Sequence, residues 1–468
     1  MQPTDADVDV PTRPRLAEHV LARLHKVDEK NLVVLFDQRR GASFQIGMRE
    51  WVLLQMADGT RDHDGILLAA AREGAVASRA ALEEFLEKLT RQGMLFEGPA
   101  SADAEGRAPS SPPERPIDHL ADYRFDCDGR GVCCHQYSTI VFSPLEAARA
   151  RVLLPQIERG GDRHEWVFTP RHGSVPTPGC AVKHVDGACA YLRDDGLCRI
   201  HAAGGGDAKP FGCNLFPARF VDDGEAVRVT ALVECSCVIR SAAGTRGAPL
   251  IDPALKTRGE LPTEVFVEVL PPELAITASH TCSRAALVAW SRQVLATPVH
   301  DVAAWLWSVA DALDREGALP SPALATPAIS AHAMAPWLDA WRAVLDGIVA
   351  ENVAWRSGRD LALHVLDVMR ETLLVISEQG LLGAMLDSGA TQPEAEAFYL
   401  RAPAHGHQWI ADRPLSAQLR NLAMRVTLGR ALHRFRGAGV LTGEAFEEPI
   451  ALVEAMCRGY GAHVDEPA

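Results

Sequence analysis

The residues of this chain whose type and spacing could support chemistry are its cysteines. The sequence has 11 of them, and nine lie between Cys127 and Cys237, whereas Cys282 and Cys457 lie outside this stretch. Clustered cysteines form either a disulfide framework or a metal site, and disulfides are typical of exported chains. The chain starts with MQPTDADVDV, which has neither the basic segment nor the apolar stretch of a secretory signal. We therefore expect a cytoplasmic protein whose clustered thiols bind metal.

Thiolate sulfur is a soft ligand that suits zinc ions and iron–sulfur clusters. Nine thiols could complete two four-cysteine sites, or one site with thiols to spare. Cys133 and Cys134 are adjacent, so both could bind only through a turn or at two separate metal positions. The spacing lacks the C-x3-C-x2-C motif of radical S-adenosylmethionine enzymes and the paired C-x2-C knuckles of a zinc ribbon. The expected metal ligands are Cys127, Cys133, Cys134, Cys180, Cys189, Cys198, Cys213, Cys235 and Cys237, whereas Cys282 and Cys457 are expected to be ordinary buried thiols.

The composition is that of an ordinary soluble chain. With 468 residues it is long enough for about two to four domains, and 47% of its residues are hydrophobic and 23% charged. No stretch approaches the run of about 18 apolar residues that predicts a membrane-spanning helix. The net charge of −14 disfavours binding to nucleic acid or to an anionic membrane. We therefore expect neither as a partner, and the oligomeric state is left open.

The segment 15–98 predicts a compact module that would lie ahead of the cysteines. An apolar strand at 33–36 and an alternating strand at 42–46 predict a β-hairpin. Three helices are expected after it, over 48–56, over 62–73 and from a cap at Ser78 onward. The order is thus a hairpin followed by three helices.

The remaining segments differ in composition. Residues 99–118 are rich in Pro, Ala, Ser and Gly, which predicts a linker. Residues 119–282 hold the clustered cysteines among many glycines and prolines, which predicts an irregular metal domain. Residues 283–468 have helical periodicity almost throughout, and seven of the nine tryptophans lie between 290 and 409, which predicts an all-α domain with a tryptophan-rich core. The expected fold class is multidomain α+β.

The stretch VVLFDQRRGASFQIGMREWVLLQMADGT, followed by AALEEFLEKLTRQGML, resembles the PqqD-like family of winged-helix-like modules called RiPP recognition elements. The resemblance covers about residues 15–97. It implies that the leader peptide of a ribosomally made precursor adds as a strand to the hairpin edge and packs against the third helix. The residues that would bind the peptide are Ser43, Phe44, Gln45 and Ile46 on the edge and Leu82, Phe85, Leu86 and Leu89 on the helix.

Other roles for this module are open. The helix positions could serve only the core, in which case the module would be purely structural. A winged helix could also bind DNA, but the third helix alternates Arg79, Lys88 and Arg91 with glutamates and so offers no basic face. We favour peptide binding.

The stretches FDCDGRGVCCHQY and CAYLRDDGLCRIHAAGGGDAKPFGCNLFP resemble the YkgJ-type family of zinc- or iron-chelating cysteine-cluster domains. The chain departs from the family pattern at Arg130, where a second opening cysteine usually stands. The resemblance implies metal ligation by Cys127, Cys133, Cys134, Cys189, Cys198 and Cys213, with the missing ligand supplied by Cys180, Cys235 or Cys237.

The order of a cysteine cluster followed by a helical half is similar to flagellin lysine-N-methylases of the FliB-like family. That resemblance implies methyl transfer from S-adenosylmethionine to a peptide or protein. The leading hypothesis is an iron–sulfur protein, with a 4Fe-4S cluster or alternatively zinc, that modifies a peptide bound by its N-terminal module. A non-catalytic adaptor and a redox or metal sensor are the alternatives, so enzyme activity is left open. Five basic residues could bind an anion or, as we favour, form a solvated helix face: Arg420, Arg425, Arg430, His433 and Arg434.

Overall fold

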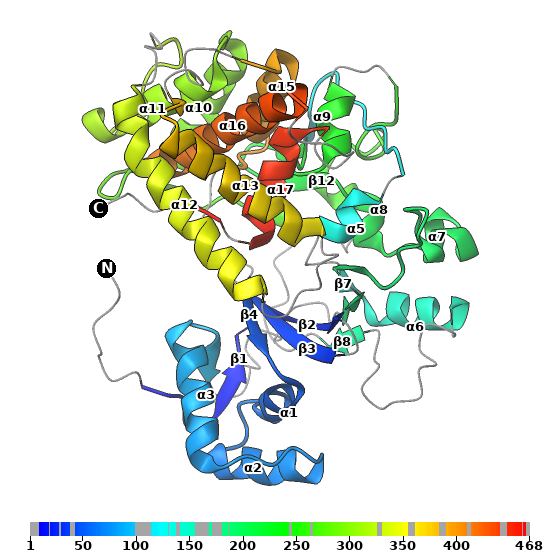
Figure 1. Ribbon diagram of the computed structural model, residues 1–468. Coiled ribbons are helices and arrows are strands. Elements are labelled where there is room, and N and C mark those ends of the chain that lie inside the picture. The colour runs from blue at the N-terminus through cyan, green and yellow to red at the C-terminus, as the bar shows by residue number, and fades with distance from the viewer. Residues whose placement is uncertain are drawn as a thin grey trace. The chain divides into compact units, whose positions relative to one another are not determined.

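The computed structural model contains both helices and sheets and is an α+β protein (Figure 1). It describes residues 9–17, 19–27, 30–37, 43–98, 114–129, 131–136, 141–154, 168–170, 180–185, 187–242, 246–262, 265–324, 330–353, 361–382, 390–409, 413–439, 447–460 and 462–464. Most of the expected linker, residues 99–113, lies outside the described residues.

The chain divides into two compact units. The first unit comprises Met1–Ser111 and Ser138–Gly212, and the second comprises Pro112–Tyr137 and Cys213–Ala468. The stretch 119–282, which we expected to be one cysteine-rich domain, therefore contributes to both units. The reason is that the chain leaves the second unit after Tyr137 and returns to it at Cys213.

A five-stranded sheet with the order β11-β10-β2-β3-β4 organises the first unit. Strands β2 (Val20–Val27), β3 (Lys30–Asp37) and β4 (Ser43–Ile46) are antiparallel, and β10 (His184–Val185) runs parallel to β2 and pairs with β11 (Ala188–Cys189). The sequence analysis did not predict β2, because Arg23 and His25 interrupt its apolar pattern. Both side chains are nevertheless buried.

The three expected helices of the first unit are present as α1 (Met48–Met56), α2 (His63–Arg72) and α3 (Arg79–Arg91). Asp62 caps α2 by accepting a hydrogen bond from the backbone N–H of Gly65, and Ser78 caps α3 in the same way. The short strands β1 (Pro14–Leu16) and β5 (Leu95–Glu97) pair beside them. The predicted order of a hairpin and three helices is thus confirmed.

Shorter elements complete the first unit. Strands β7 (Val141–Phe142), β8 (Phe168–Pro170) and β9 (Cys180–Val182) form a sheet in the order β7-β9-β8. Helix α6 (Pro144–Leu153) begins at a capping box between Ser143 and Glu146. It is followed by α7 (Arg199–Gly204) and a 3-10 turn over Gly206–Ala208.

A four-stranded sheet with the order β14-β12-β13-β6 lies in the second unit. Strands β12 (Ala218–Asp222) and β13 (Val227–Ala231) form an antiparallel hairpin, and β14 (Val267–Val269) and β6 (Ile117–His119) pair in parallel with its two sides. Strands β15 (Glu273–Ala275) and β16 (Thr281–Ser283) form a separate hairpin that leads into the helical half.

Every regular element described after residue 283 is a helix, as the periodicity predicts. Ahead of this half, the short helices α5 (Val132–Gln136), α8 (Phe211–Leu215), α9 (Ser236–Ala242) and the 3-10 turn Arg258–Glu260 connect the strands. No helix in the described ranges has the length and apolar character needed to cross a membrane. The helices are α10 (Arg284–Ala296), α11 (Val302–Glu316), α12 (Ala331–Val353), α13 (Leu361–Glu378), α15 (Pro393–His405), α16 (Leu415–Gly437) and α17 (Pro449–Tyr460).

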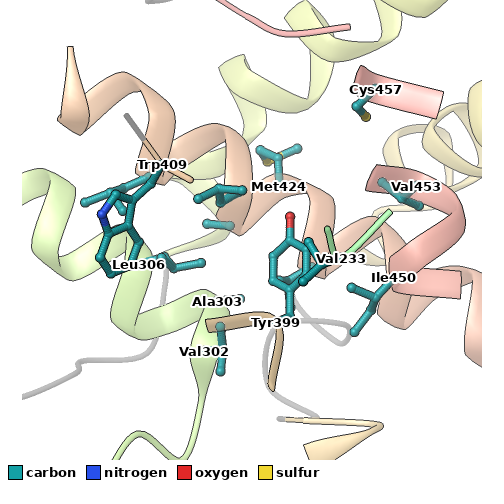
Figure 2. Close-up of a cluster of buried hydrophobic side chains, with 14 of the residues drawn as sticks. Val233, Val302, Ala303, Leu306, Tyr399, Trp409, Met424, Ile450, Val453 and Cys457 are labelled. Atoms are coloured by element: carbon teal, nitrogen blue, oxygen red, sulfur yellow. The ribbon is translucent and has the colours of Figure 1, made fainter. Parts of the chain in front are cut away.

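Apolar side chains from these helices form the core of the second unit, as Figure 2 shows. Val302 and Leu306 of α11, Met424 of α16 and Val453 of α17 all belong to this cluster. Three buried tryptophans extend this core, because the ring of Trp290 lies 6.3 Å from that of Trp305 and 5.5 Å from that of Trp409. The prediction of a tryptophan-rich helical core is confirmed.

Arg420, Arg425 and Arg430 of α16 neither form a solvated face nor offer a free anion site, so both expectations were wrong for them. His433 and Arg434 are half-buried, and nothing tests their expected role. Helix α16 packs against α11, α13 and α17, which buries Arg420 and Arg430 and half-buries Arg425. Arg430 is 1% exposed and donates to both carboxylate oxygens of Glu396 at 3.0 and 2.6 Å. Arg425 contacts both oxygens of Glu454 at 3.0 Å. These arginines are committed to ion pairs within the core.

Candidate metal centre

Cys235 and Cys237 are positioned by the chain that follows β13. This strand ends in the core, and a tight turn then leads into α9, where the N–H of Val238 donates to the carbonyl of Cys235 at 2.9 Å. Val238 and Ile239 bury the apolar side of α9. Both cysteines are 6% exposed. The two thiols therefore lie at the start of a helix that is fixed by its own apolar packing.

Cys127 is brought to this helix by hydrogen bonds of the preceding residues. Phe125 pairs with Ala248 through two backbone hydrogen bonds of 2.7 and 2.9 Å. The N–H of Asp126 donates to the hydroxyl of Ser241 on α9 at 3.0 Å, and that hydroxyl donates to the carbonyl of Cys237 at 2.6 Å. Cys127 itself is exposed. A thiol at the surface of the unit thus joins two buried ones.

The three thiols interact directly. The pKa of Cys237 lies well below its usual range because the thiols of Cys127 and Cys235 both donate hydrogen bonds to its sulfur. The same hydrogen bonds raise the pKa of Cys127 and of Cys235, and burial adds to the effect on both. The arrangement therefore stabilises one thiolate between two thiols, and a thiolate is the form that binds metal.

We call Cys127, Cys235 and Cys237 together the thiol group. Two charged side chains lie against it. The Oδ1 of Asp128 lies 3.3 Å from the sulfur of Cys237. The guanidinium of Arg240 donates to the same sulfur at 3.4 Å and also contacts Asp128. The donor atoms of Cys127, Asp128 and Cys237 all lie within 4.8 Å of one another.

Three other predicted ligands lie in the same unit. Cys133 is close enough to Cys127 and Cys235 to affect their ionisation electrostatically. Helix α5, rather than an extended chain, holds Cys133 and Cys134. Cys134 and Cys213 are half-buried. Ligation by these three residues stays a prediction.

The last three predicted ligands belong to the first unit. Cys189 is 8% exposed and pairs across β10 and β11 with His184, which in turn pairs with His25 on β2. Cys198 stands at the N-terminus of α7. Cys180 lies on β9, and its side chain is outside the described part of the structure. Only six of the nine predicted ligands thus share the unit that contains the thiol group.

The thiol group fits a metal by the chemistry of its donors. Sulfur ligands select zinc, copper(I) or iron–sulfur clusters over magnesium and calcium. A tetrahedral zinc ion with Zn–S bonds of about 2.3 Å would separate its sulfurs by about 3.8 Å. The donor atoms of Cys127, Asp128 and Cys237 lie within 4.8 Å of one another. An iron–sulfur cluster also needs thiolate ligands, but each thiolate binds a different iron. Ten of the 11 cysteines have described side chains, and these are thiols rather than disulfides.

The predicted peptide edge is β4. Among the described strands, β4 pairs only with β3 and is the edge of its sheet. Gln45 is exposed, Phe44 is half-buried and Ile46 is buried. The side chain of Ser43 lies outside the description. The edge could therefore accept a strand while Phe44 and Gln45 contact its side chains.

The helix positions predicted to bind the peptide belong to the core. Leu82 and Leu89 have no exposure, Leu86 is 1% exposed and Phe85 9% exposed. They pack with Trp51 and Ile66 in one cluster. The expectation that they face a peptide is corrected, because this apolar stripe of α3 closes the core of the module. The open alternative that these positions serve the core is confirmed.

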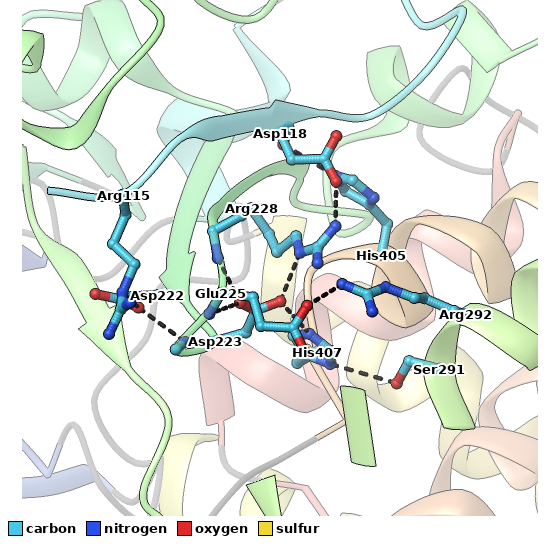
Figure 3. Close-up of polar contacts among 12 residues, drawn as sticks. Arg115, Asp118, Asp222, Asp223, Glu225, Arg228, Ser291, Arg292, His405 and His407 are labelled. Atoms are coloured by element: carbon cyan, nitrogen blue, oxygen red, sulfur yellow. Dashed lines mark hydrogen bonds and ion pairs between the residues drawn. The ribbon is translucent and has the colours of Figure 1, made fainter. Parts of the chain in front are cut away.

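A second polar group in the second unit was not predicted from the sequence (Figure 3). The hydroxyl of Ser291 lies 3.4 Å from Nδ1 of His407, whose Nε2 lies 3.4 Å from Oδ2 of Asp223. Arg228 donates to the same oxygen of Asp223 at 2.6 Å. These residues come from α10, from the chain after α15 and from the turn between β12 and β13. The residues are far apart in the sequence and form no motif, so sequence patterns could not predict that they meet.

This group has the residue types of a serine–histidine–aspartate triad but is buried. Ser291 is 2% exposed, His407 3% and Asp223 1%. A nucleophile must reach its substrate, and this hydroxyl lies inside the packed unit. His407 also has a φ of 49°, a left-handed conformation that non-glycine residues seldom adopt. We assign the group a structural role in fixing the end of α15 to the β12–β13 turn.

Comparison with known proteins found no relative of this chain. No family model matches the chain, and neither a curated protein nor a solved structure matches it significantly. Its function must therefore be argued from its own residues.

Proposed function

We propose that this chain is a metal–thiolate protein that binds an extended peptide and takes part in its modification. The observation that supports the metal centre is the convergence of Cys127, Asp128 and Cys237, whose donor atoms all lie within 4.8 Å of one another, with Cys235 hydrogen-bonded to Cys237. Two distant segments converge to make this contact, and soft thiolates have few uses in a reducing compartment other than metal binding or redox chemistry.

The proposed metal is iron in an iron–sulfur cluster, such as a 4Fe-4S cluster, or a zinc ion. Cys127, Cys235 and Cys237 would hold it, with Cys133, which affects the ionisation of Cys127 and Cys235, as a further thiol. The number of clustered cysteines favours a cluster, whereas the close spacing of the donors favours a single ion. Acid-labile sulfide distinguishes the two, because only an iron–sulfur cluster contains it.

The proposed peptide site is the edge formed by β4. An added strand gains backbone hydrogen bonds from the edge and side-chain contacts from Phe44 and Gln45. The ion pairs along α3 support a peptide ligand over DNA. Arg79 pairs with Glu83, Lys88 with Glu84 and Arg91 with Glu87, at 2.5 to 2.8 Å, so the positive charges of this helix are compensated locally.

Methyl transfer from S-adenosylmethionine to the bound peptide is the reaction that the resemblance to lysine-N-methylases suggests. Fusing a peptide-binding module to a modifying centre raises the effective concentration of the substrate to roughly millimolar. A non-catalytic adaptor would bind the peptide and leave its mass unchanged. A sensor would bind it with an affinity that depends on the metal. Mass spectrometry of the peptide after incubation with the cofactor separates these functions.

The peptide site is tested by binding measurements on the full chain. The probes are the N-terminal segments of small proteins encoded beside this gene, each labelled with a fluorophore. A Phe44→Asp variant should weaken the binding of a responsive probe at least tenfold, because the charge opposes an apolar contact at the edge. Leu68→Asp is the matched control, since Leu68 of α2 is 60% exposed and away from the edge. Equal binding by both variants would contradict the β4 site.

A further inference from the structure

Asp128 lies where a metal ligand would lie. Its Oδ1 is 3.3 Å from the sulfur of Cys237, and its carboxylate, Cys127 and Cys237 offer donor atoms that all lie within 4.8 Å of one another. We propose that Asp128 is a direct ligand, so that the centre is bound by three thiolates and one carboxylate. This inference rests on the proposed thiol centre of Cys127, Cys235 and Cys237.

The charges of the group support a bound cation. A carboxylate oxygen and two sulfurs from two distant segments converge within 4.8 Å of one another, which is an arrangement that a cation can bridge. Arg240 supplies one positive charge at the rim, where its side chain is 33% exposed. A divalent or trivalent metal ion would supply positive charge between the sulfurs and the carboxylate.

Arg240 holds Asp128 in the orientation of a ligand. Its guanidinium contacts Oδ2 of Asp128, which leaves Oδ1 directed at the thiols. The same guanidinium donates to the sulfur of Cys237 at 3.4 Å and lies 3.5 Å from Oε2 of Glu447. Ligand carboxylates in proteins are themselves held by hydrogen bonds of this kind. Arg240 is thus a positioning residue that acts through Asp128 and Cys237.

The sequence around Cys127 is consistent with an oxygen ligand. Arg130 stands three residues after Cys127, where a C-x2-C pair would place its second thiol. The opening segment therefore offers one thiol and one carboxylate in consecutive positions. Cys133, which raises the pKa of Cys127 and of Cys235 electrostatically, is the competing fourth ligand.

A carboxylate would give this centre an exchangeable position. Soft metals hold thiolates more strongly than carboxylates, so the Asp128 oxygen would be the ligand that leaves most readily. Asp128 is 27% exposed in its side chain, so the position is open to solvent. A substrate carrying a nitrogen, oxygen or sulfur donor could bind the metal there.

The test uses cobalt(II) as the probe, added to the full chain without oxygen. Thiolate-to-cobalt charge-transfer absorption reports binding, and competition with zinc gives the affinity. We expect Asp128→Ala to weaken binding at least tenfold and Asp128→Cys to restore it with stronger charge-transfer absorption from the added thiolate. Cys133→Ser tests the competing ligand and is expected to weaken binding less than Asp128→Ala does. Asp195→Ala, which removes an exposed carboxylate in the first unit, is the matched control.

The outcomes separate this inference from the proposed function. Unchanged affinity in Asp128→Ala, together with a loss in Cys133→Ser, would overturn the Asp128 ligand and assign Cys133 in its place. No charge-transfer absorption in the wild-type chain would instead overturn the thiol centre itself. The behaviour of Asp128→Cys guards against misfolding of the alanine variant, because a misfolded centre would not be restored by a thiol.

Discussion

The N–H of Asp126 donates a hydrogen bond of 3.0 Å to the hydroxyl of Ser241, across 115 residues of sequence. This contact joins the two segments that carry the thiol group. Ser241 also donates to the carbonyl of Cys237, so one hydroxyl sets the position of Cys127 relative to α9. The geometry of the centre therefore depends on a residue that binds no metal.

Replacing this hydroxyl should loosen the metal centre. A Ser241→Ala variant is expected to bind metal about 10-fold more weakly, because the groups that orient ligands typically contribute 10- to 100-fold in affinity. Its stability should fall by about 1 kcal/mol for the lost hydrogen bonds. Competition with a chromogenic chelator measures the affinity. Ser308→Ala is the control, since Ser308 bonds only its own helix in the described contacts, and equal affinities in both variants would contradict the role of Ser241.

Removing the buried carboxylate of Asp223 should destabilise the second unit. Burial alone would raise the pKa of Asp223, but hydrogen bonds from His407, from the backbone N–H groups of Ala226 and Glu225, and from Arg228 lower it well below its usual range. Asp223→Asn would remove one of the two carboxylates that pair with Arg228, the other being Asp118, at a cost of about 2 kcal/mol. Urea unfolding measures the difference.

The matched control for that experiment is Glu225→Gln in the same turn. Glu225 pairs with Arg292 at the surface, where both side chains are about half exposed. Exposed pairs contribute less than about 1 kcal/mol. A loss as small in Asp223→Asn as in Glu225→Gln would show that the group in Figure 3 does not stabilise the fold.

His405 should make the stability of the second unit depend on pH. Burial lowers its pKa below the usual 6.5, and the nearby Arg228 and His407 act in the same direction, although Asp118 opposes them. The unfolded chain therefore binds this proton more readily, so stability is lost as the pH falls below about 6.5. His405→Gln should lose less stability between pH 7.5 and pH 5.5 than the wild type. Identical pH profiles in thermal unfolding would rule out this contribution.

Metal should protect the exposed thiol of the centre from alkylation. Cys127 is exposed and should react with iodoacetamide in metal-free protein, slowly because its raised pKa keeps most of the thiol protonated, but not in metal-loaded protein. Cys457 is 1% exposed and should stay unlabelled in both until the chain unfolds. Peptide mapping by mass spectrometry reports each site separately. Equal labelling of Cys127 with and without metal would argue that it is not a ligand.

Local signals in the sequence predicted the elements that depend on local chemistry. The cap at Ser78 and the spacing of Leu82, Phe85 and Leu89 predicted α3, since capping and helical periodicity are properties of neighbouring residues. Cys457, which lies outside the cysteine cluster, was expected to be an ordinary buried thiol, and its burial is confirmed. Cys282 is only half-buried and so departs from this prediction.

Features that depend on distant residues were beyond the reach of sequence patterns. Arg430 and Arg425 of α16 were expected to belong to a solvated face. In the structure they pair with Glu396 and Glu454, which lie on other helices. Asp128 carries no metal-ligand spacing with Cys237, 109 residues away. Clustering in sequence also does not imply clustering in space, because Cys189 and Cys198 fall in a different unit from Cys237.

The most direct test of the metal centre is the iron, zinc and acid-labile sulfide content of the full chain purified without oxygen. The wild type and a Cys282→Ser control should contain the same metal, at one ion or one cluster per chain, and Cys237→Ser should contain at most a tenth of it. Cys282 is the suitable control because it lies in the same unit and outside the thiol group. Full metal content in Cys237→Ser, or none in the wild type, would contradict the account.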